Sequence, residues 1–380
     1  MLLTDAQVVH PVGPPTRGWV RVEADRITAM GVGPQPVPLA GEAVRELGGA
    51  LLMPGFIDVH VHGGGGGSFD TGDPAEVART VSYQRRNGTT RCLASLVTAP
   101  VPELLAEVSS LAELVEDGVI TGIHLEGPFL SEAHRGAQDR RYLLQPDLDV
   151  VDQLLKAGRG TVRMMTLAPE LIGAVPLVRR LAGEGVLAAI GHSGATYAQA
   201  GAAIDAGARV ATHLFNGMPP FHHREPGIAG AVLERDEVTC ELICDPHHLH
   251  ANAILLASRL ARGRTAFVTD AISAAGKDDG LYRVGPLSVR VEHREARVEG
   301  TTTLAGSTIS QAGAVRYALN EVGMPIEDVA HAVSTASARL LGIDKVTGSI
   351  EVGKVADLVM LDAELRVAAV VVGGEMQEVA

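Results

Sequence analysis

Short apolar runs rich in β-branched residues recur through the middle of the chain, separated by stretches in which apolar residues have helical spacing. The runs predict eight strands, over residues 56–61, 89–97, 119–125, 161–167, 186–190, 209–212, 238–244 and 265–269. The intervening pattern predicts helices, for example over 102–116, 174–182, 198–206 and 251–261. Eight β/α repeats in roughly 290 residues are typical of a TIM-type (β/α)8 barrel.

An open, doubly wound sheet is the alternative architecture for alternating strands and helices. No G-x-G-x-x-G motif follows the first predicted strand, and a count of eight strands favours closure. The sequence therefore predicts an α/β protein whose central sheet is a barrel.

Both ends of the chain have the pattern of short β segments with glycine and aspartate turns. The predicted strands are 2–10 and 18–32, the latter with a hairpin turn at Ala24-Asp25, then 348–352, 356–362 and 365–372. We expect a small β-sandwich domain made from residues 1–52 and 345–380, and a catalytic barrel over 53–344.

The composition is that of an ordinary folded protein, with 46% hydrophobic and 20% charged residues. The net charge of −13 and the lack of a basic block argue against nucleic acid or an anionic membrane as partner. No apolar run approaches the roughly 20 residues of a membrane helix, and no secretory signal pattern is visible. Cys92, Cys240 and Cys244 form no CxxC pair, so we expect reduced thiols in a cytoplasmic protein.

Histidines and carboxylates gather at the predicted strand ends, where a barrel of this type places its catalytic residues. They are His60 and His62 on the first strand, Glu126 on the third, His192 on the fifth, His213 on the sixth and Asp270 on the eighth. Alternate residues of a strand point the same way, so an H-x-H pair can share one ion. Imidazole and carboxylate ligands suit a divalent ion, and zinc is the ion we expect.

The donor types also indicate a reaction class. Two imidazoles and one carboxylate leave a bound ion with an open position for water, whose pKa falls from about 15.7 to near 7. A separate carboxylate can then take the proton, and Asp270 on the last strand is the natural candidate. The fourth strand end, residues 166–170, has no lysine that could bridge two ions, which leaves Glu126 as the central carboxylate. The sequence predicts metal-assisted hydrolysis.

Several sequence blocks resemble the N-acetylglucosamine-6-phosphate deacetylase family of the amidohydrolase superfamily. They are PGFIDVHVHGGGG (54–66), HLEGPFL (124–130), GHSGAT (191–196), THLFNGMPP (212–220), REPGIAG (224–230) and VTDAISAAG (268–276). The tail GSIEVGKVADLVMLD (348–362) resembles the closing β segment of the superfamily. The first block and the tail are superfamily signals, whereas HLEGPF, THLFN.M and REPG are more specific.

The resemblance implies hydrolysis of N-acetylglucosamine 6-phosphate to glucosamine 6-phosphate and acetate, in a homodimer. It implies Glu126, His192 and His213 as metal ligands and Asp270 as general base and later acid. His60 and His62, with Asp270, match a second ion site that some members have, so one or two ions per subunit are expected.

The resemblance also assigns contacts to the substrate. These are Asn216 and the backbone N–H of Gly217 for the sugar phosphate, Arg224 for the phosphate, His248 for the sugar, and Leu304, Ala305, Gly306 and Ser307 as the segment that closes over it. Independently, residues 221–224 form a local cationic cluster in an acidic chain, and a guanidinium grips phosphate with a fork of donors. The alternative is an ion pair between Arg224 and Glu225 or a nearby aspartate. In the implied dimer, one subunit's loop completes the phosphate site of the other.

One position departs from the family pattern. Where the family usually has a histidine that polarises the acetyl carbonyl, this chain has Gln138, and we expect Gln138 and its neighbour Ala137 to contact the substrate. Glutamine can donate a neutral hydrogen bond in that place. Two alternatives stay open: His134 is the donor, or the metal alone polarises the carbonyl and Gln138 faces solvent.

Two other functions stay open as well. Another amidohydrolase, such as a deaminase or cyclic amidase, would not depend on a substrate phosphate. A catalytically inactive binding or structural protein on the same barrel should have lost its ligands, whereas Glu126, His192, His213 and Asp270 are all present. The native metal, the occupancy of the second site, the oligomer and the pathway do not follow from the sequence.

Overall fold

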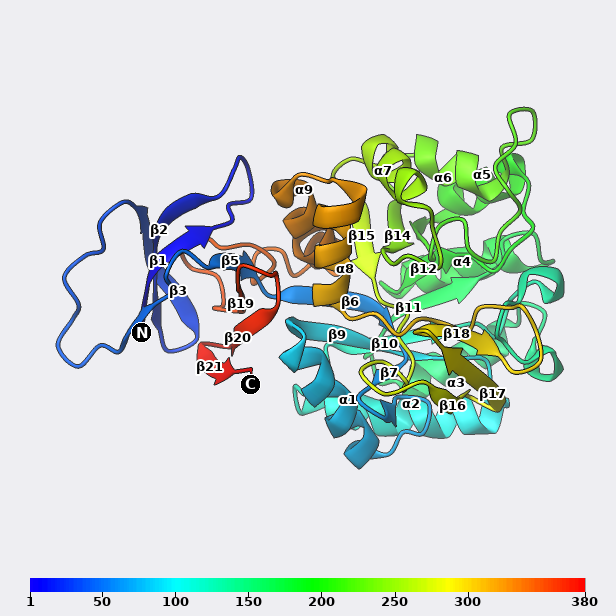
Figure 1. Ribbon diagram of the computed structural model, residues 1–380. Helices are drawn as coiled ribbons and strands as arrows, with labels where there is room; N and C mark the ends of the chain where they lie inside the picture. The colour runs from blue at the N-terminus through cyan, green and yellow to red at the C-terminus, as the bar shows by residue number, and fades with distance from the viewer. Residues whose placement is uncertain (380) are drawn as a thin grey trace. The chain divides into compact units, whose positions relative to one another are not determined.

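The computed structural model describes residues 1–379, and its central feature is a parallel sheet of eight strands (Figure 1). The strands are β6 (Phe56–Val61), β9 (Thr89–Leu96), β10 (Gly122–Glu126), β11 (Val162–Leu167), β12 (Leu187–Ile190), β13 (Ala208–Ala211), β14 (Thr239–Ile243) and β15 (Thr265–Val268). Their order in the sheet follows the chain, and the pairs from β9 to β15 are parallel. Each coincides with a predicted strand within about three residues, the usual uncertainty of strand ends.

Hydrogen bonds between the last and first strand ends close the sheet. The Asp270 N–H donates to the carbonyl of His60 at 2.8 Å, and the His62 N–H donates to the carbonyl of Ala271 at 2.9 Å. An open sheet would leave these edge groups unpaired. The (β/α)8 barrel prediction is confirmed, and the open-sheet alternative is wrong.

Helices follow most barrel strands. They are α1 (Pro74–Arg86), α2 (Val101–Glu116), α3 (Leu148–Ala157), α4 (Ala174–Gly183), α5 (Tyr197–Ala206), α6 (Gly227–Glu234), α7 (Ala251–Leu260), α8 (Gln311–Tyr317), α9 (Ile326–Ala330) and α10 (Ala336–Leu340). Helix α2 buries Leu104, Val108 and Leu111, whose spacing puts them on one face. Helix α5 begins at a capping box in which Thr196 and Gln199 satisfy each other's backbone N–H groups.

Strands from both ends of the chain form a second sheet. They are β1 (Leu2–Val8), β2 (Thr16–Glu23), β3 (Arg26–Val32), β4 (Val44–Glu46), β5 (Leu51–Pro54), β19 (Leu358–Leu361), β20 (Val367–Val372) and β21 (Glu375–Glu378). Antiparallel pairing of β19 with β5 joins the two ends, and Leu3, Ile27 and Leu358 share one buried core. The terminal β domain is therefore confirmed. The strand predicted over 348–352 is wrong, because turns and bends occupy these residues.

The chain divides into two compact units. One comprises Met1–Asp58, Gln84–Arg91 and Gln311–Ala380, and the other Val59–Tyr83 and Cys92–Ser310. The division groups helices α8–α10 with the terminal sheet. The boundaries at 52/53 and 344/345 stay a prediction.

A small antiparallel sheet after β15 was not predicted. It consists of β16 (Gly280–Val284), β17 (Leu287–Glu292) and β18 (Glu295–Val298). Val289, Val291 and Ala296 pack with Val97 and Ile272 in a buried cluster. A two-residue hairpin, β7 (Gly63–Gly64) with β8 (Gly67–Ser68), is formed by the glycine run after β6.

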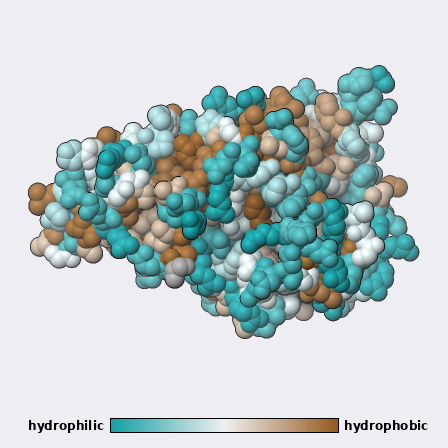
Figure 2. Space-filling view, viewed as in Figure 1, coloured by the Kyte–Doolittle hydropathy of each residue, from teal (hydrophilic) through white to brown (hydrophobic). Residues whose placement is uncertain are grey.

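The surface mixes polar and apolar side chains. On the face drawn in Figure 2, hydrophobic residues lie in groups among hydrophilic ones. Such a mixture is usual, because a folded chain has too little polar surface to cover itself. Among the described residues, no helix has the length and hydrophobicity required to cross a bilayer.

Glu107 lies on α2, and the pH dependence of its ionisation tests whether its side chain is partly buried as the structure shows. Burial, together with the charges of Asp70 and Glu103, raises its pKa from 4.5 to about 8. A raised pKa means that the folded state favours the protonated form of Glu107. Its contribution to the free energy of unfolding is therefore fully present below about pH 4.5 and is lost as the pH rises through 8. We expect Glu107→Gln to raise the melting temperature at pH 8.5 by about 2 °C or more, and by much less at pH 5.

Thermal unfolding at the two pH values measures this difference. Glu113, exposed on the same helix, supplies the matched control, Glu113→Gln. An equal shift at both pH values for Glu107→Gln would contradict the role given to burial.

Candidate active site

The candidate active site lies at the carboxyl ends of the barrel strands. His60 lies on β6 and His62 directly follows it, and Glu126 ends β10. His192, His213 and Asp270 come within two residues after β12, β13 and β15, with positive φ angles of 47°, 28° and 48°. Non-glycine residues rarely adopt such angles, which cost about 1–3 kcal/mol each and cluster at functional sites. The backbone is thus bent at three strand ends to present these side chains.

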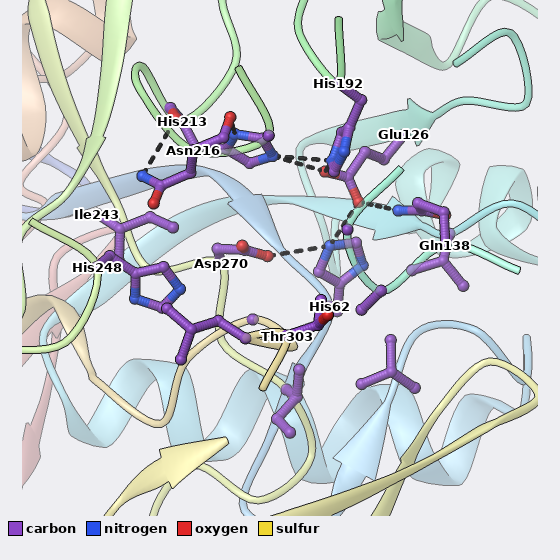
Figure 3. A pocket seen from close by; sticks show the side chains of 18 of the residues that line it. His62, Glu126, Gln138, His192, His213, Asn216, Ile243, His248, Asp270 and Thr303 are labelled. Carbon is purple, nitrogen blue, oxygen red and sulfur yellow. Dashed lines mark hydrogen bonds and ion pairs between the residues drawn. The ribbon is translucent and has the colours of Figure 1, made fainter. Parts of the chain in front are cut away.

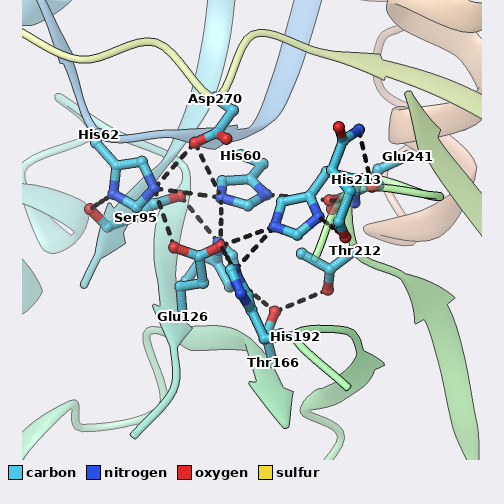
Figure 4. Close-up of polar contacts among 12 residues, drawn as sticks. His60, His62, Ser95, Glu126, Thr166, His192, Thr212, His213, Glu241 and Asp270 are labelled. Carbon is cyan, nitrogen blue, oxygen red and sulfur yellow. Dashed lines mark hydrogen bonds and ion pairs between the residues drawn. The ribbon is translucent and has the colours of Figure 1, made fainter. Parts of the chain in front are cut away.

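Glu126, His192 and His213 form the first group of converging donors (Figure 4). Glu126 Oε1 lies 2.9 Å from His192 Nε2 and 3.2 Å from His213 Nε2. All three residues are buried, and their donor atoms lie within 4.8 Å of one another. The structure brings together the residues that the sequence assigns to one tight ion.

His60, His62 and Asp270 form the second group. Asp270 Oδ1 lies 3.3 Å from His62 Nε2 and 3.6 Å from His60 Nε2. Glu126 also reaches this group, because its Oε1 lies 3.4 Å from His60 Nε2 and its Oε2 lies 3.4 Å from His62 Nε2. Glu126 therefore stands between the two groups, in the central position expected of it.

Each of the four imidazoles has an oxygen at its Nδ1, which directs Nε2 to the centre. The pairs are His62 with the Ser95 carbonyl (3.1 Å), His192 with the His134 carbonyl (2.9 Å), His213 with the Asn216 carbonyl (3.1 Å) and His60 with Glu241 Oε2 (3.1 Å). This arrangement fixes the tautomer that a metal ligand needs.

The donor set fits divalent metal ions. Nitrogen and oxygen ligands of this kind suit zinc and similar ions. Burial lowers the pKa of His62, but Asp270 and Glu126 outweigh this effect and raise it to about 10. For the carboxylate of Glu126 burial has the opposite effect and raises the pKa, but the nearby imidazoles of His60 and His192 outweigh it and hold the pKa well below its usual value. The carboxylates are therefore charged, and a cation at this centre would be compensated.

A cavity of about 330 Å³ opens onto both groups (Figure 3). Of the residues predicted to contact substrate, those that line it are Ala137, Gln138, Asn216, Gly217, His248, Leu304 and Gly306. Its apolar lining, which the sequence did not reveal, includes Val97, Ile243, Ile272 and Val284. Thr302 and Thr303 line it as well.

Three predicted substrate residues do not line this cavity. Ala305 is buried in the core of the β16–β18 sheet. Ser307 holds the backbone that carries Asp270. Its N–H donates to the Asp270 carbonyl at 2.7 Å, and its hydroxyl donates to the Thr269 carbonyl at 2.6 Å. Arg224 is exposed, with its guanidinium 2.7 Å from His223 Nε2. Within one chain, the structure does not bring Arg224 to the other site residues.

Gln138 is buried and holds Glu126. Its Nε2 donates to Glu126 Oε2 at 2.5 Å, and its Oε1 accepts from the Thr98 N–H at 2.7 Å. The alternative that it faces solvent is wrong. His134 contributes through its backbone, since its carbonyl accepts from His192 Nδ1.

Close packing explains the glycine at 217 and the position of His248. Gly217 has a φ of 61°, and a Cβ there would lie 3.1 Å from His192 Nδ1. His248 Nδ1 lies 2.8 Å from Asp245 Oδ2, and the backbone N–H groups of His247 and His248 donate to Asp245 Oδ1. These bonds hold the His248 ring at the cavity.

The sequence profile of the amidohydrolase family matches residues 51–377. The chain belongs to the amidohydrolase family. N-acetylgalactosamine-6-phosphate deacetylase from Escherichia coli O157:H7 is 36% identical to this amidohydrolase, over 90% of this chain and 91% of its own. N-acetylglucosamine-6-phosphate deacetylase from Bacillus subtilis strain 168 is 35% identical, over 97% of this chain and 94% of its own.

A solved structure of a similar protein contains a ligand. It is a mutant of N-acetyl-D-glucosamine-6-phosphate deacetylase from Mycobacterium smegmatis in complex with N-acetyl-D-glucosamine-6-phosphate. The two chains are 43% identical, with a TM-score of 0.94 over 99% of this amidohydrolase and 98% of the other chain.

Gln138 provides a test of how Glu126 is held. Gln138→Ala removes the donor to Glu126 Oε2, and the loss of such an outer partner weakens metal binding by about 10- to 100-fold. We expect a loss in that range for the tightest divalent ion, measured by competition with a chelator. Gln153→Ala, at an exposed position on α3, is the control. Wild-type affinity in Gln138→Ala would show that Glu126 is positioned without it.

Proposed function

We propose that this amidohydrolase is a metal-dependent deacetylase that hydrolyses N-acetylglucosamine 6-phosphate to glucosamine 6-phosphate and acetate. The observation that carries the proposal is the cavity that opens onto Glu126 and both donor groups. The similarity to a deacetylase in complex with this sugar phosphate, over nearly the whole of both chains, supports the choice of substrate.

The metal centre takes its ligands from both groups. Glu126, His192 and His213 would hold the tighter ion, and His60 and His62, with Asp270, a second one; zinc suits both donor sets. When bound, a divalent ion polarises the acetyl carbonyl and lowers the pKa of water.

Asp270 performs the proton transfers. Burial raises its pKa, but His60 and His62 lower it below the usual value, so the carboxylate is ionised at neutral pH. It takes the proton of the attacking water and then gives it to the amine nitrogen as the C–N bond breaks. The bonds from Ser307 and to His60 fix its backbone for this exchange.

Cavity residues bind the sugar and its acetyl group. The cavity volume is at the lower end of the range for small-molecule sites, which suits a monosaccharide. His248 contacts the sugar, Asn216 and the Gly217 N–H face its phosphate, and the neutral amide of Gln138 lies beside the acetyl oxygen. Thr302, Thr303, Leu304 and Gly306 line the cavity, and the segment 304–307 would close over the substrate.

The phosphate arginine comes from a second copy of the chain. Arg224 is exposed and does not line the cavity of its own chain, which supports a role in another subunit's site. We therefore propose a homodimer in which each subunit supplies Arg224 to its partner. The three cysteines are buried and form no disulfide within residues 1–379, which is consistent with a cytoplasmic enzyme.

Acetate release tests the reaction and its catalytic base together. Purified protein with divalent metal should release acetate from the 6-phosphate and far less from N-acetylglucosamine. Asp270→Asn, nearly isosteric but unable to take a proton, should still bind the substrate in calorimetry and lose at least about 100-fold in turnover.

Each alternative has its own outcome in this assay. A deaminase or a cyclic amidase would release no acetate here but would hydrolyse an unphosphorylated amine or cyclic amide, whereas a binding protein would turn over none of these compounds. Faster release from N-acetylgalactosamine 6-phosphate would change the sugar, because a relative with that activity is similarly close. Turnover within about fivefold of wild type in Asp270→Asn would place the base elsewhere.

Arg224 tests both the phosphate contact and the dimer. A charge-assisted hydrogen bond is worth about 1.5–3 kcal/mol, so Arg224→Ala should weaken use of the phosphorylated sugar by roughly 10- to 200-fold and spare the unphosphorylated one. Equal losses on both sugars would assign Arg224 to the fold.

Mixed dimers then distinguish the two chains. When Arg224→Ala and Asp270→Asn subunits are unfolded and refolded together, half of the dimers contain one intact site, so activity should recover to roughly a quarter of wild type. No recovery would mean that Arg224 acts within its own subunit.

A further inference from the structure

Glu241 is a buried carboxylate for which the proposed mechanism has no use. It lies in the middle of β14, between apolar neighbours, and its side chain is fully buried in the barrel interior (Figure 4). Its Oε2 lies 3.1 Å from His60 Nδ1 and accepts from the His213 backbone N–H at 3.2 Å. Within the described part of the chain, its Oε1 has no hydrogen-bond partner.

The acceptor at His60 differs from those at the other three imidazoles. His62, His192 and His213 each have a neutral backbone carbonyl at Nδ1, whereas His60 alone has a carboxylate. A carboxylate partner fixes the ring and increases the basicity of the ligand nitrogen, which strengthens its bond to a metal ion. The difference therefore favours His60 as a ligand.

The burial of the Glu241 carboxylate also favours a positive ion near His60. A buried ionised carboxylate is costly unless an opposite charge compensates it. Residues 1–379 give Glu241 one ion-pair partner, the His60 imidazole, which is the ring that faces the second donor group. His124 is a further buried imidazole beside His60, and its two ring nitrogens lie 2.9 Å from the hydroxyls of Ser95 and Thr166. A divalent ion among His60, His62 and Asp270 would supply the missing positive charge.

We propose that Glu241 is a positioning residue that holds His60 as a ligand and thereby determines whether the second ion binds. The inference rests on the proposed two-ion centre and deepens it. Glu241 belongs to neither donor group and does not line the substrate cavity. Its side chain contacts the His60 ring and the backbone N–H of His213, and we expect it to act on the second ion through His60.

Metal stoichiometry of the purified protein tests this role directly. Glu241→Gln keeps an oxygen within reach of His60 Nδ1 but removes the charge. After dialysis against graded chelator, inductively coupled plasma mass spectrometry should find two zinc ions per wild-type chain. In Glu241→Gln, the second ion should bind about 10- to 100-fold more weakly while the first is retained.

Thr166→Val is the matched control. Thr166 is another buried polar residue of the barrel interior, but its hydroxyl contacts His124 and Thr212 and no proposed metal ligand. It should keep two ions. A His60→Ala background separates positioning from general stability, since adding Glu241→Gln there should cause no further loss of metal. If Glu241→Gln does not fold, Glu241→Asp, which withdraws the carboxylate by one methylene, should give the same selective loss.

Three results would overturn the inference. They are two tight ions in Glu241→Gln, simultaneous loss of both ions, and a wild-type protein that never holds more than one. Acetate release by the wild-type enzyme is measured separately, so a one-ion enzyme that still deacetylates would end this inference and leave the proposed function intact.

Discussion

The carboxylate of Glu126 lies within 3.4 Å of a ring nitrogen of each of four buried histidines. Moving a charged carboxylate out of water costs several kcal/mol unless nearby groups compensate it. Gln138 donates to one of its oxygens, and the four imidazoles surround both. These donors compensate the buried carboxylate, and a divalent ion held by the same imidazole nitrogens would supply positive charge at the same place.

The barrel provides the rigidity that this centre requires. Parallel strands deliver the six residues of the two groups from different parts of the sheet to one rim. Left-handed backbone at His192, His213 and Asp270 then aims three of them inward. The strain at these positions is supported by specific bonds, such as that from the Ser307 N–H to the Asp270 carbonyl.

The sequence predicted what depends on regular geometry. Strand ends in a barrel share one rim, so the sequence alone is enough to group Glu126, His192, His213 and Asp270. Loop positions were harder: the resemblance brought Gln138 to the site, but its bond to Glu126 depends on a loop path that no periodicity encodes. That Arg224 lies outside the cavity of its own chain fits the dimer that the resemblance implies, but no periodicity in the sequence encodes this position.

Glu241 was missed for a different reason. The run TCELIC has the apolar pattern of a buried strand, and the strand prediction over 238–244 treated the glutamate as part of it. A charged residue in such a strand is itself a signal, since glutamate is almost never fully buried without a partner. The small sheet β16–β18 is missing from the prediction for another reason. Buried and exposed residues alternate along β16 and β17 as in any half-buried strand, but the eight β/α repeats already complete a barrel without them.

Anomalous diffraction from crystals of the zinc-loaded protein, recorded on both sides of the zinc absorption edge, tests the central position of Glu126 most directly. The account predicts two peaks, one among Glu126, His192 and His213 and one among His60, His62 and Asp270, with the Glu126 carboxylate between them. A zinc peak that Glu126 does not touch would contradict it.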